Sequence, residues 1–210
     1  MYLYLLIESI IFCKQEYMKR VGVFCASSPK VKQCFLSEAA NLAEELVKAG
    51  YGIVYGGGGV GLMGFLADKA IELKGDITGV IPRFMVEVEW EHKGVYNMIH
   101  VDDMAERKRL LVKDTSAIVV LAGGTGTLEE LFEVLSLKKL GKFQQPVVIV
   151  NTDGYYDPLL EMLQKMIDED FMRLEHGQMW HVVNSASEVC QALDNIPDWS
   201  TNAIEFAAVK

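Results

Sequence analysis

The sequence lacks several features that would assign it to a particular class of protein. Its four cysteines are far apart and form no C-x-x-C pair, so neither a disulfide framework nor a zinc site is predicted. Its four histidines are isolated and show no metal-ligand spacing. The formal net charge of −9 argues against nucleic acid as the main partner, because proteins that bind phosphate backbones usually carry a basic patch. These absences predict a protein of the reducing cytoplasm with no metal and no nucleic-acid partner.

The sequence also lacks a targeting or membrane-spanning segment of the usual kind. Residues 1–17 contain an apolar run, but Glu8 interrupts it, and the segment has neither a basic start nor a small-residue cleavage site. Met18 directly precedes Lys19, Arg20 and the first convincing strand. We therefore interpret residues 1–17 as an N-terminal extension, either ahead of the true translation start or packing on a neighbour. No membrane partner is predicted.

Two kinds of apolar pattern alternate from residue 18 to residue 196. Buried, β-branched runs predict strands at 21–26, 51–55, 77–81, 97–101, 117–122, 146–150 and 182–183. Apolar spacings of three and four predict helices at 31–49, before 74–75, at 103–114, at 128–141, from 158 and at 187–193. The alternation predicts one α/β domain with a doubly wound, mostly parallel, Rossmann-like sheet over residues 18–196. Residues 197–210 are expected to form a tail without a strong pattern.

Two glycine-rich loops follow predicted strands, at residues 56–64 and 123–127. Glycine lets the backbone turn sharply and approach a ligand, and free N–H groups at the start of a following helix favour an anion. In parallel sheets of this kind, ligands bind beyond the carboxyl ends of the strands. Both loops are therefore expected to face one crevice and to hold a negatively charged group.

The first loop satisfies the dinucleotide pattern G-x-G-x-x-G, but its context differs from that of the fingerprint. It follows the second strand rather than the first, and Asp76 precedes the third strand instead of ending it. Arg83 keeps a phosphorylated dinucleotide open as an alternative. No Lys-Ser or Lys-Thr follows the glycines, which excludes a triphosphate-binding P-loop. A mononucleotide phosphate suits the two loops better.

Polar residues mark three further places. Residues 83–96 show no clear period and are interpreted as a loop that could cover a site. Asp102 or Asp103 is expected to cap the next helix, with Glu106 completing a capping box. Glu129 and Glu130 would lie in the first turn of a helix that begins at Leu128. They either complement the helix dipole there or serve a function.

Five motifs occur in order along the chain: VFCASS at 23–28, YGGGGVGLMG at 55–64, DMAERK at 103–108, GGTGTLEE at 123–130 and DGYY at 153–156. Together they resemble the Lonely Guy (LOG) family of cytokinin riboside 5′-monophosphate phosphoribohydrolases, over residues 20–193. The resemblance implies a homodimer, and no cofactor is expected. It also implies hydrolysis of the N-glycosidic bond of a nucleoside 5′-monophosphate, which releases the free base and ribose 5-phosphate.

The resemblance implies that Arg107 and Glu130 are catalytic. Departure of the base builds positive charge on the ribose, which a carboxylate such as Glu130 can stabilise while it helps to position or activate water. Arg107 would stabilise negative charge on the departing base or hold the substrate. Taken alone, it would instead be interpreted as an exposed helix residue paired with Asp103.

The other motif residues are expected to bind the substrate, with backbone N–H groups and threonine hydroxyls taking the phosphate. The candidate substrate-binding residues are Ser27, Gly57, Gly58, Lys108, Gly124, Thr125, Gly126 and Thr127. Gly61 and Gly64 are expected only to turn the chain. Met63 and Met104 are left unassigned, because methionine is usually core filler.

The chain departs from the family pattern at four motif positions. The family usually shows serine, histidine, proline and tyrosine where this chain has Gly59, Ala105, Ala122 and Thr125. The base preference therefore stays open, and AMP or another purine monophosphate is the expected substrate. A non-catalytic nucleotide-binding module is the alternative. A decarboxylase would require pyridoxal phosphate on a lysine, and no lysine stands out as its partner.

Overall fold

The computed structural model describes residues 18–88, 90–197, 199–200 and 202–207. The extension predicted at residues 1–17 and the end of the predicted tail lie outside the described residues. Within the described residues, no helix combines the length and the apolar character needed to cross a membrane.

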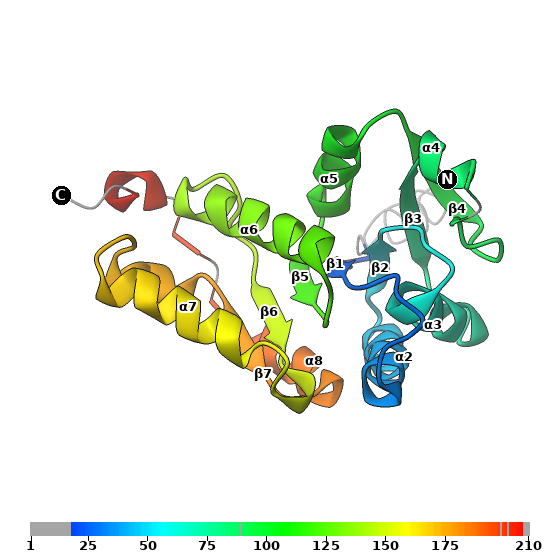
Figure 1. The fold of residues 1–210 in the computed structure, drawn as a ribbon, viewed down its shortest axis with the longest axis horizontal. Coiled ribbons are helices and arrows are strands. Elements are labelled where there is room, and N and C mark those ends of the chain that lie inside the picture. The colour runs from blue at the N-terminus through cyan, green and yellow to red at the C-terminus, as the bar shows by residue number, and fades with distance from the viewer. Residues whose placement is uncertain (1–17, 89, 198, 201, 208–210) are drawn as a thin grey trace, which may run out of the picture.

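A parallel sheet of seven strands forms the centre of the described chain (Figure 1). Its order is β4-β3-β2-β1-β5-β6-β7, and every neighbouring pair in it is parallel. The strands are β1 (Arg20–Phe24), β2 (Gly52–Tyr55), β3 (Ile77–Pro82), β4 (Asn97–Val101), β5 (Ala117–Val120), β6 (Val147–Val150) and β7 (His181–Val183). This confirms the predicted strands to within one or two residues, and the sheet is wholly rather than mostly parallel.

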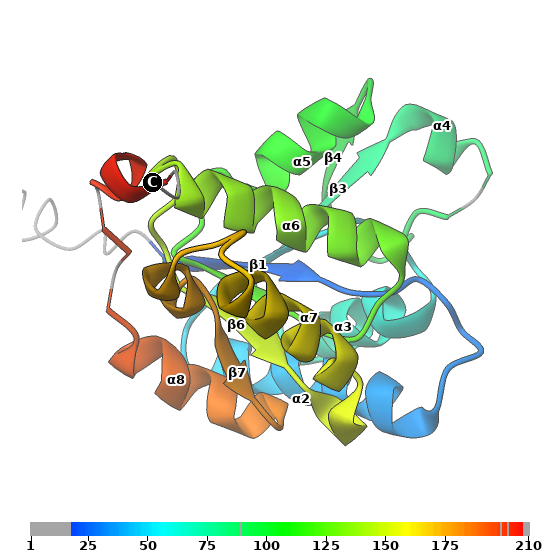
Figure 2. The same ribbon diagram turned by 60° about the vertical axis from the view of Figure 1, so that its left-hand side comes forward.

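Helices cover both faces of the sheet (Figure 2). Side chains of one face pack with α2 (Gln33–Lys48), α3 (Gly61–Glu72) and α8 (Val189–Asn195). Those of the other pack with α5 (Met104–Val112), α6 (Thr125–Lys139) and α7 (Asp157–Asp168). The shorter elements are α4 (Arg83–Val86), η1 (Thr152–Gly154), η2 (Leu174–Gln178), η3 (Ala186–Glu188) and η4 (Ala203–Phe206). The doubly wound fold is confirmed.

Strand side chains alternate between the two cores, as the pleat of a strand requires. In β5, Ala117 and Val119 join the core under α2 and α3, whereas Ile118 and Val120 join the core under α5 and α6. Because all four residues are buried, the strand appears in the sequence as a continuous apolar run.

The sheet order has a switch point between β1 and β5. The chain builds β2, β3 and β4 on one side of β1, and it returns to place β5, β6 and β7 on the other. The connections after β1 and β5 therefore diverge from the same place at the carboxyl edge. In doubly wound sheets this divergence leaves the crevice in which ligands bind.

The structure corrects one predicted boundary that bears on the site. Helix α6 begins at Thr125 rather than at Leu128, because residues 125–127 are already helical and Leu128 N–H bonds to Gly124 O at 3.0 Å. Apolar periodicity could not show this, since the first helical residues are threonine and glycine. Glu129 and Glu130 lie beyond the first turn, which holds no acidic residue, so the helix-dipole interpretation of these two residues is wrong.

Other local predictions are refined. Asp103 is the N-cap of α5, and its side chain accepts a hydrogen bond from Glu106 N–H at 2.7 Å. The Glu106 carboxylate accepts from Asp102 N–H rather than from the cap itself, at 3.1 Å. The loop predicted at 83–96 contains α4 and returns to the first glycine loop through a bridge between Gly58 and Glu91.

Candidate active site

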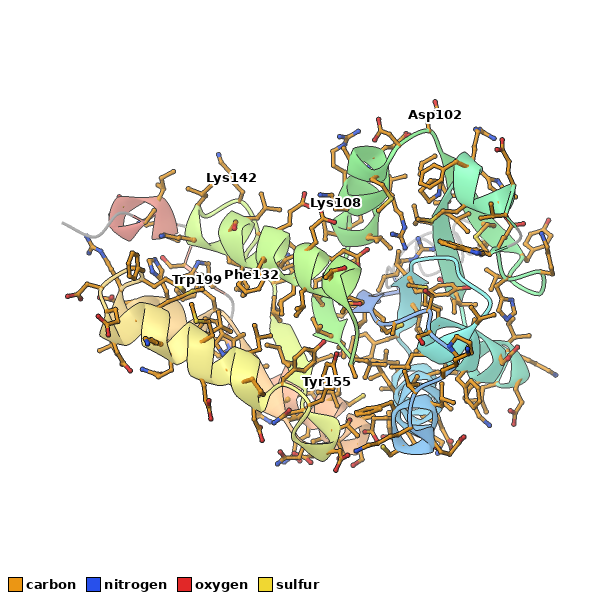
Figure 3. All side chains as sticks on the ribbon, viewed as in Figure 1. Asp102, Lys108, Phe132, Lys142, Tyr155 and Trp199 are labelled. Carbon is orange, nitrogen blue, oxygen red and sulfur yellow. The ribbon has the colours of Figure 1, made fainter. Side chains whose placement is uncertain are left out.

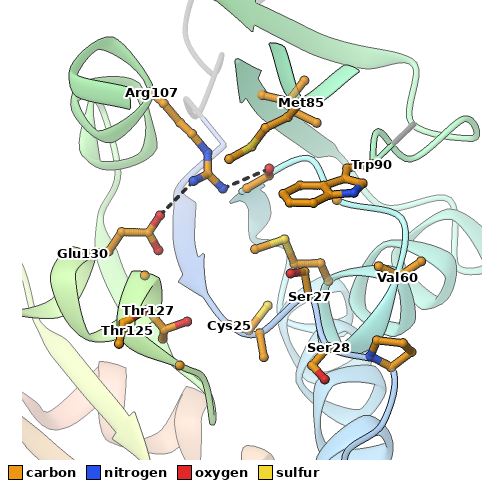
Figure 4. Close-up of a pocket in the computed structure, with 18 residues that line it drawn as sticks. Cys25, Ser27, Ser28, Val60, Met85, Trp90, Arg107, Thr125, Thr127 and Glu130 are labelled. Carbon is orange, nitrogen blue, oxygen red and sulfur yellow. Dashed lines mark hydrogen bonds and ion pairs between the residues drawn. The ribbon is translucent and has the colours of Figure 1, made fainter. Parts of the chain in front are cut away.

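A cavity of about 520 Å³ opens at the carboxyl edge of the sheet. It is bounded by the connections after β1, β2 and β5, by α5 and α6, and by the segment after β3 (Figure 4). Its lining residues are Cys25, Ala26, Ser27, Ser28, Pro29, Gly56, Gly58, Val60, Met63, Ile81, Met85, Trp90, Arg107, Gly124, Thr125, Gly126, Thr127 and Glu130. The two glycine loops therefore face one crevice, as predicted.

Arg107 on α5 and Glu130 on α6 form a buried ion pair in this cavity. Arg107 Nη1 lies 3.4 Å from Glu130 Oε1, and the two residues are only 6% and 7% exposed. The guanidinium also donates from Nε to Val80 O at 3.2 Å and from Nη2 to Gly56 O at 3.1 Å. The alternative interpretation of Arg107 as an exposed partner of Asp103 is therefore wrong. Backbone carbonyls at the ends of two strands fix its position.

The guanidinium explains why residue 56 is a glycine. A Cβ at Gly56 would lie 2.2 Å from Arg107 Nη2 and 2.9 Å from the terminal methyl group of Met63. Any side chain at this position would push the guanidinium away from its carbonyl partners. Gly56 thus contributes to the charged pair by leaving space for it.

Burial raises the pKa of Glu130 to about 7. The positive charge of Arg107 acts in the opposite direction, and the negative charge of Glu129 adds a smaller increase. The cost of removing the carboxylate from water exceeds the attraction of its partner, which is typical of carboxyl groups held in apolar clefts. A carboxyl group with a pKa near neutrality can accept or donate a proton at the pH of a cell.

Cys25 lies in the same lining but is not activated. Its thiol is buried, and burial together with the charge of Glu130 raises its pKa well above the ordinary value. A thiol becomes a nucleophile when it forms the thiolate, which this environment disfavours. Cys25 is therefore a small apolar wall residue of the cavity.

The start of α6 forms another side of the cavity. Gly124 is its extended N-cap, no side chain caps the helix start, and Gly124, Thr125, Gly126 and Thr127 all line the cavity. A Cβ at Gly124 or at Gly126 would meet nothing within 4 Å, so both glycines border open space. Uncapped helix N–H groups are partners for an anion.

Lys108 follows Arg107 but has a different environment. Its Nζ lies 2.7 Å from Glu129 Oε1 and 2.7 Å from Glu133 Oε2, both on α6 (Figure 3). These two carboxylates raise the pKa of the Lys108 amine above its usual range. Lys108 is not among the lining residues of the cavity, and neither is Gly57. The other candidate substrate-binding residues, Ser27 and Gly58 among them, do line it.

Sequence reasoning did not assign an apolar group of lining residues, which includes Val60, Ile81, Met85 and Trp90. Two of them belong to the aperiodic segment 83–96, which was predicted to cover a site. The signal available in the sequence was a large aromatic residue in a segment that shows no core-facing pattern. Among the described residues, no cluster of histidine, cysteine, aspartate or glutamate side chains could hold a metal ion.

Several known proteins are similar to this chain. A family model described as "Possible lysine decarboxylase" matches residues 63–193. A cytokinin riboside 5′-monophosphate phosphoribohydrolase of Arabidopsis thaliana is 38% identical over 176 residues, which are 84% of this chain and 77% of the relative. The chain belongs to the LOG family. A LOG-family relative from Oryza sativa subsp. japonica, named as a probable enzyme of the same type, is 40% identical over 186 residues. The match covers 89% of this chain and 75% of the relative.

Solved structures share the fold of this LOG-family chain at lower identity. The molybdenum cofactor carrier protein of Chlamydomonas reinhardtii superposes with a TM-score of 0.66 at 18% identity, over 85% of this chain and 98% of that protein. The molybdenum cofactor binding protein of Rippkaea orientalis gives a TM-score of 0.65 at 17% identity, over 87% and 99% of the two chains. At these identities the likeness shows the fold alone.

Proposed function

We propose that the chain hydrolyses the N-glycosidic bond of a nucleoside 5′-monophosphate, with Glu130 and Arg107 as its catalytic residues. The observation that carries the proposal is a buried acid–guanidinium pair that shares one cavity with an uncapped helix start. The names of the curated relatives, which specify cleavage of a riboside 5′-monophosphate, support the same reaction. Residues 18–196 would form the catalytic domain.

The phosphate would bind at the start of α6. The free N–H groups of the first turn and the hydroxyls of Thr125 and Thr127 supply donors, and the helix dipole favours the negative charge. Gly124 and Gly126 leave room for the phosphate oxygens, because neither glycine has a neighbour within 4 Å of a Cβ position. Binding there would place the ribose toward Glu130, one turn further along the same helix.

Glu130 would act on the sugar. As the bond from C1′ to the base nitrogen breaks, its electron pair leaves with the base and positive charge develops on the ribose. The Glu130 carboxylate stabilises that charge and accepts a proton from the water that attacks C1′. The products are ribose 5-phosphate and the free base, which takes up one proton as Glu130 releases the proton that it accepted from water. The reaction written in this way requires no cofactor.

Arg107 would hold this arrangement. Its three contacts, to Val80 O, Gly56 O and Glu130, leave it little freedom to move, so it presents a fixed positive charge to the cavity. That charge keeps part of the Glu130 population ionised at neutral pH and attracts electron density that leaves with the base. Because a guanidinium does not lose its proton in this pH range, Arg107 is not proposed as an acid.

AMP is the first substrate to test, because the four family departures at Gly59, Ala105, Ala122 and Thr125 leave the base preference open. A homodimer is carried by the family resemblance alone, and a cytoplasmic location by the scattered cysteines. Both stay proposals, which size-exclusion chromatography with light scattering and cell fractionation would test.

The test of the reaction is incubation with AMP and, separately, with isopentenyladenosine monophosphate. Free base and ribose 5-phosphate are then measured, with Glu130→Gln as the control variant. We expect stoichiometric release of both products, and a rate at least a hundredfold lower in the variant. Saturable binding of AMP without release of base from either compound would contradict the proposal and would favour a nucleotide-binding module.

A further inference from the structure

The proposed reaction leaves one side of the cavity unused. Val60, Ile81, Met85 and Trp90 line the cavity with apolar surface. Figure 4 shows Val60, Met85 and Trp90 across the cavity from Thr125 and Thr127. The phosphate-binding groups and this apolar wall therefore lie on opposite sides, with the Arg107–Glu130 pair bordering the space between them.

Trp90 is the largest exposed surface of that wall. The residue is 53% exposed and Val60 is 48% exposed, and both line the cavity. Leaving this much apolar surface in contact with water is unfavourable, and an apolar ligand surface would relieve it. An indole also has a broad flat face, which suits a flat partner.

The backbone holds Trp90 in place. Its carbonyl accepts a hydrogen bond from Gly59 N–H at 2.9 Å, and its own N–H donates to Met85 O at 3.2 Å. Two residues further on, His92 N–H donates to Gly57 O at 2.9 Å. The segment after β3 is thereby joined to the first glycine loop, so the backbone that carries the indole is positioned at the cavity before any ligand binds.

We propose that Trp90 is the residue that recognises the base, by stacking its indole on the base plane. The inference rests on the proposed function and follows from its geometry. With the phosphate at the start of α6 and C1′ beside Glu130, the base extends toward the opposite wall, where Trp90 and Met85 lie. Stacking recognises the area of an aromatic ring rather than a hydrogen-bond pattern. Purine monophosphates are therefore bound more tightly than pyrimidine monophosphates, because a bicyclic base covers more of the indole.

A binding experiment tests the stacking directly. The chain has three tryptophans, and the other two, Trp180 and Trp199, pack with the core under α5, α6 and α7 and do not line the cavity. In a Glu130→Gln background, which slows turnover, we expect AMP to quench tryptophan fluorescence in a saturable way. Ribose 5-phosphate, which lacks a base, should not quench it. The Trp90→Phe variant in the same background should lose the quenching.

A kinetic experiment then separates base recognition from a general effect on the loop. We expect Trp90→Ala to raise KM for AMP about tenfold, as loss of one stacking contact does, with a small change in kcat. Trp90→Phe, which retains an aromatic face, should recover most of the affinity. Inhibition by ribose 5-phosphate should be unchanged in both variants. Phe84→Ala is the matched control, because Phe84 is a half-exposed aromatic of the same segment that does not line the cavity.

Three results would overturn the inference. They are quenching that persists in Trp90→Phe, an equal loss of ribose 5-phosphate and AMP affinity in Trp90→Ala, and a fluorescence change that follows protein concentration instead of AMP. The last would identify a surface for self-association. If AMP quenches Trp90 but no base is released by the unmodified chain, the proposed reaction fails while the stacking inference stands. If the unmodified chain releases base and Trp90→Ala does so with the same kinetics, the proposed reaction stands while the stacking inference fails.

Discussion

Arg107 and Glu130 lie 3.4 Å apart on two different helices, and both are almost completely buried. A carboxylate beside a guanidinium ordinarily has a lowered pKa, yet the pKa of Glu130 is raised to about 7. Burial is the larger effect, because the cavity removes water from the carboxylate more completely than one partner can compensate. The pair therefore combines a fixed cation with a carboxyl group whose pKa lies near neutrality.

The first prediction concerns the dependence of activity on pH. If the Glu130 carboxylate is the active form, kcat/KM for AMP should rise with pH and reach a plateau above an apparent pKa near 7. The free energy of unfolding should instead fall as the pH rises. Folded Glu130 binds its proton more tightly than a glutamate in the unfolded chain does, so the stability that Glu130 contributes is lost as the pH rises from about 4.5 to 7.

The loss of stability should be on the order of 3 kcal/mol at most, complete above the folded pKa. Urea unfolding at several pH values measures it, with Glu130→Gln as the comparison. If the free energy of unfolding of Glu130→Gln falls between pH 4.5 and 7 as steeply as that of the unmodified chain, Glu130 is not the cause of the pH dependence.

The second prediction separates two roles for Lys108. Its contacts with Glu129 and Glu133 join α5 to α6, and its charge lowers the pKa of Glu130. We expect Lys108→Met to lower kcat several-fold and to move the apparent pKa of the activity profile upward, with little change in KM. Lys108→Arg, which keeps the charge, should restore the profile. An increase in KM for AMP as the main effect would instead support the substrate-binding role predicted from the sequence.

The third prediction tests the start of α6 as the phosphate site. Gly126→Asp has room for its side chain, since a Cβ there meets nothing within 4 Å, and an acidic residue in the first turn favours the helix by about 0.5 kcal/mol. The carboxylate should nevertheless compete with the phosphate for the same N–H groups. We expect KM for AMP to rise at least tenfold. Thermal unfolding checks that the fold is retained, and Gly126→Ala is the control. An unchanged KM in Gly126→Asp would place the phosphate elsewhere.

The fourth prediction concerns the C-terminal segment, for which the sequence shows no strong pattern. Trp199 is buried, its Nε1 donates to Lys138 O at 2.7 Å, and the Lys138 amine lies 5.7 Å from the centre of its ring (Figure 3). Trp199→Ala should lower the free energy of unfolding by about 3 kcal/mol, as large-to-small substitutions in cores do. KM should be unchanged, because Trp199 does not line the cavity.

Chemical denaturation measures this loss. Leu174→Ala provides the comparison, because Leu174 is 79% exposed and should change stability by less than about 0.5 kcal/mol. Equal stability of the Trp199→Ala variant and the unmodified chain would show that the segment packs without contributing to the fold.

Periodicity and turn chemistry were sufficient for most of the architecture. The buried run at β5 and the helical spacing of α2 each depend on a few neighbouring residues, and these signals do not require knowledge of the rest of the chain. At the start of α6 these local signals failed to predict the first residue of the helix. Thr125, Gly126 and Thr127 have no apolar period, yet they form the first turn of the helix after the extended N-cap Gly124.

The sequence by itself determined the alternation of strands and helices, the place of both glycine loops at one edge of the sheet, and the motifs that resemble the LOG family. Only the tertiary structure decided that Arg107 is buried against Glu130 and that Lys108 faces α6 instead of the cavity. It also decided that Trp90 lines the cavity on the side opposite Thr125 and Thr127. The first set follows from interactions between near neighbours. The second depends on which distant segments exclude water from one another, and burial of that kind is a property of the assembled fold.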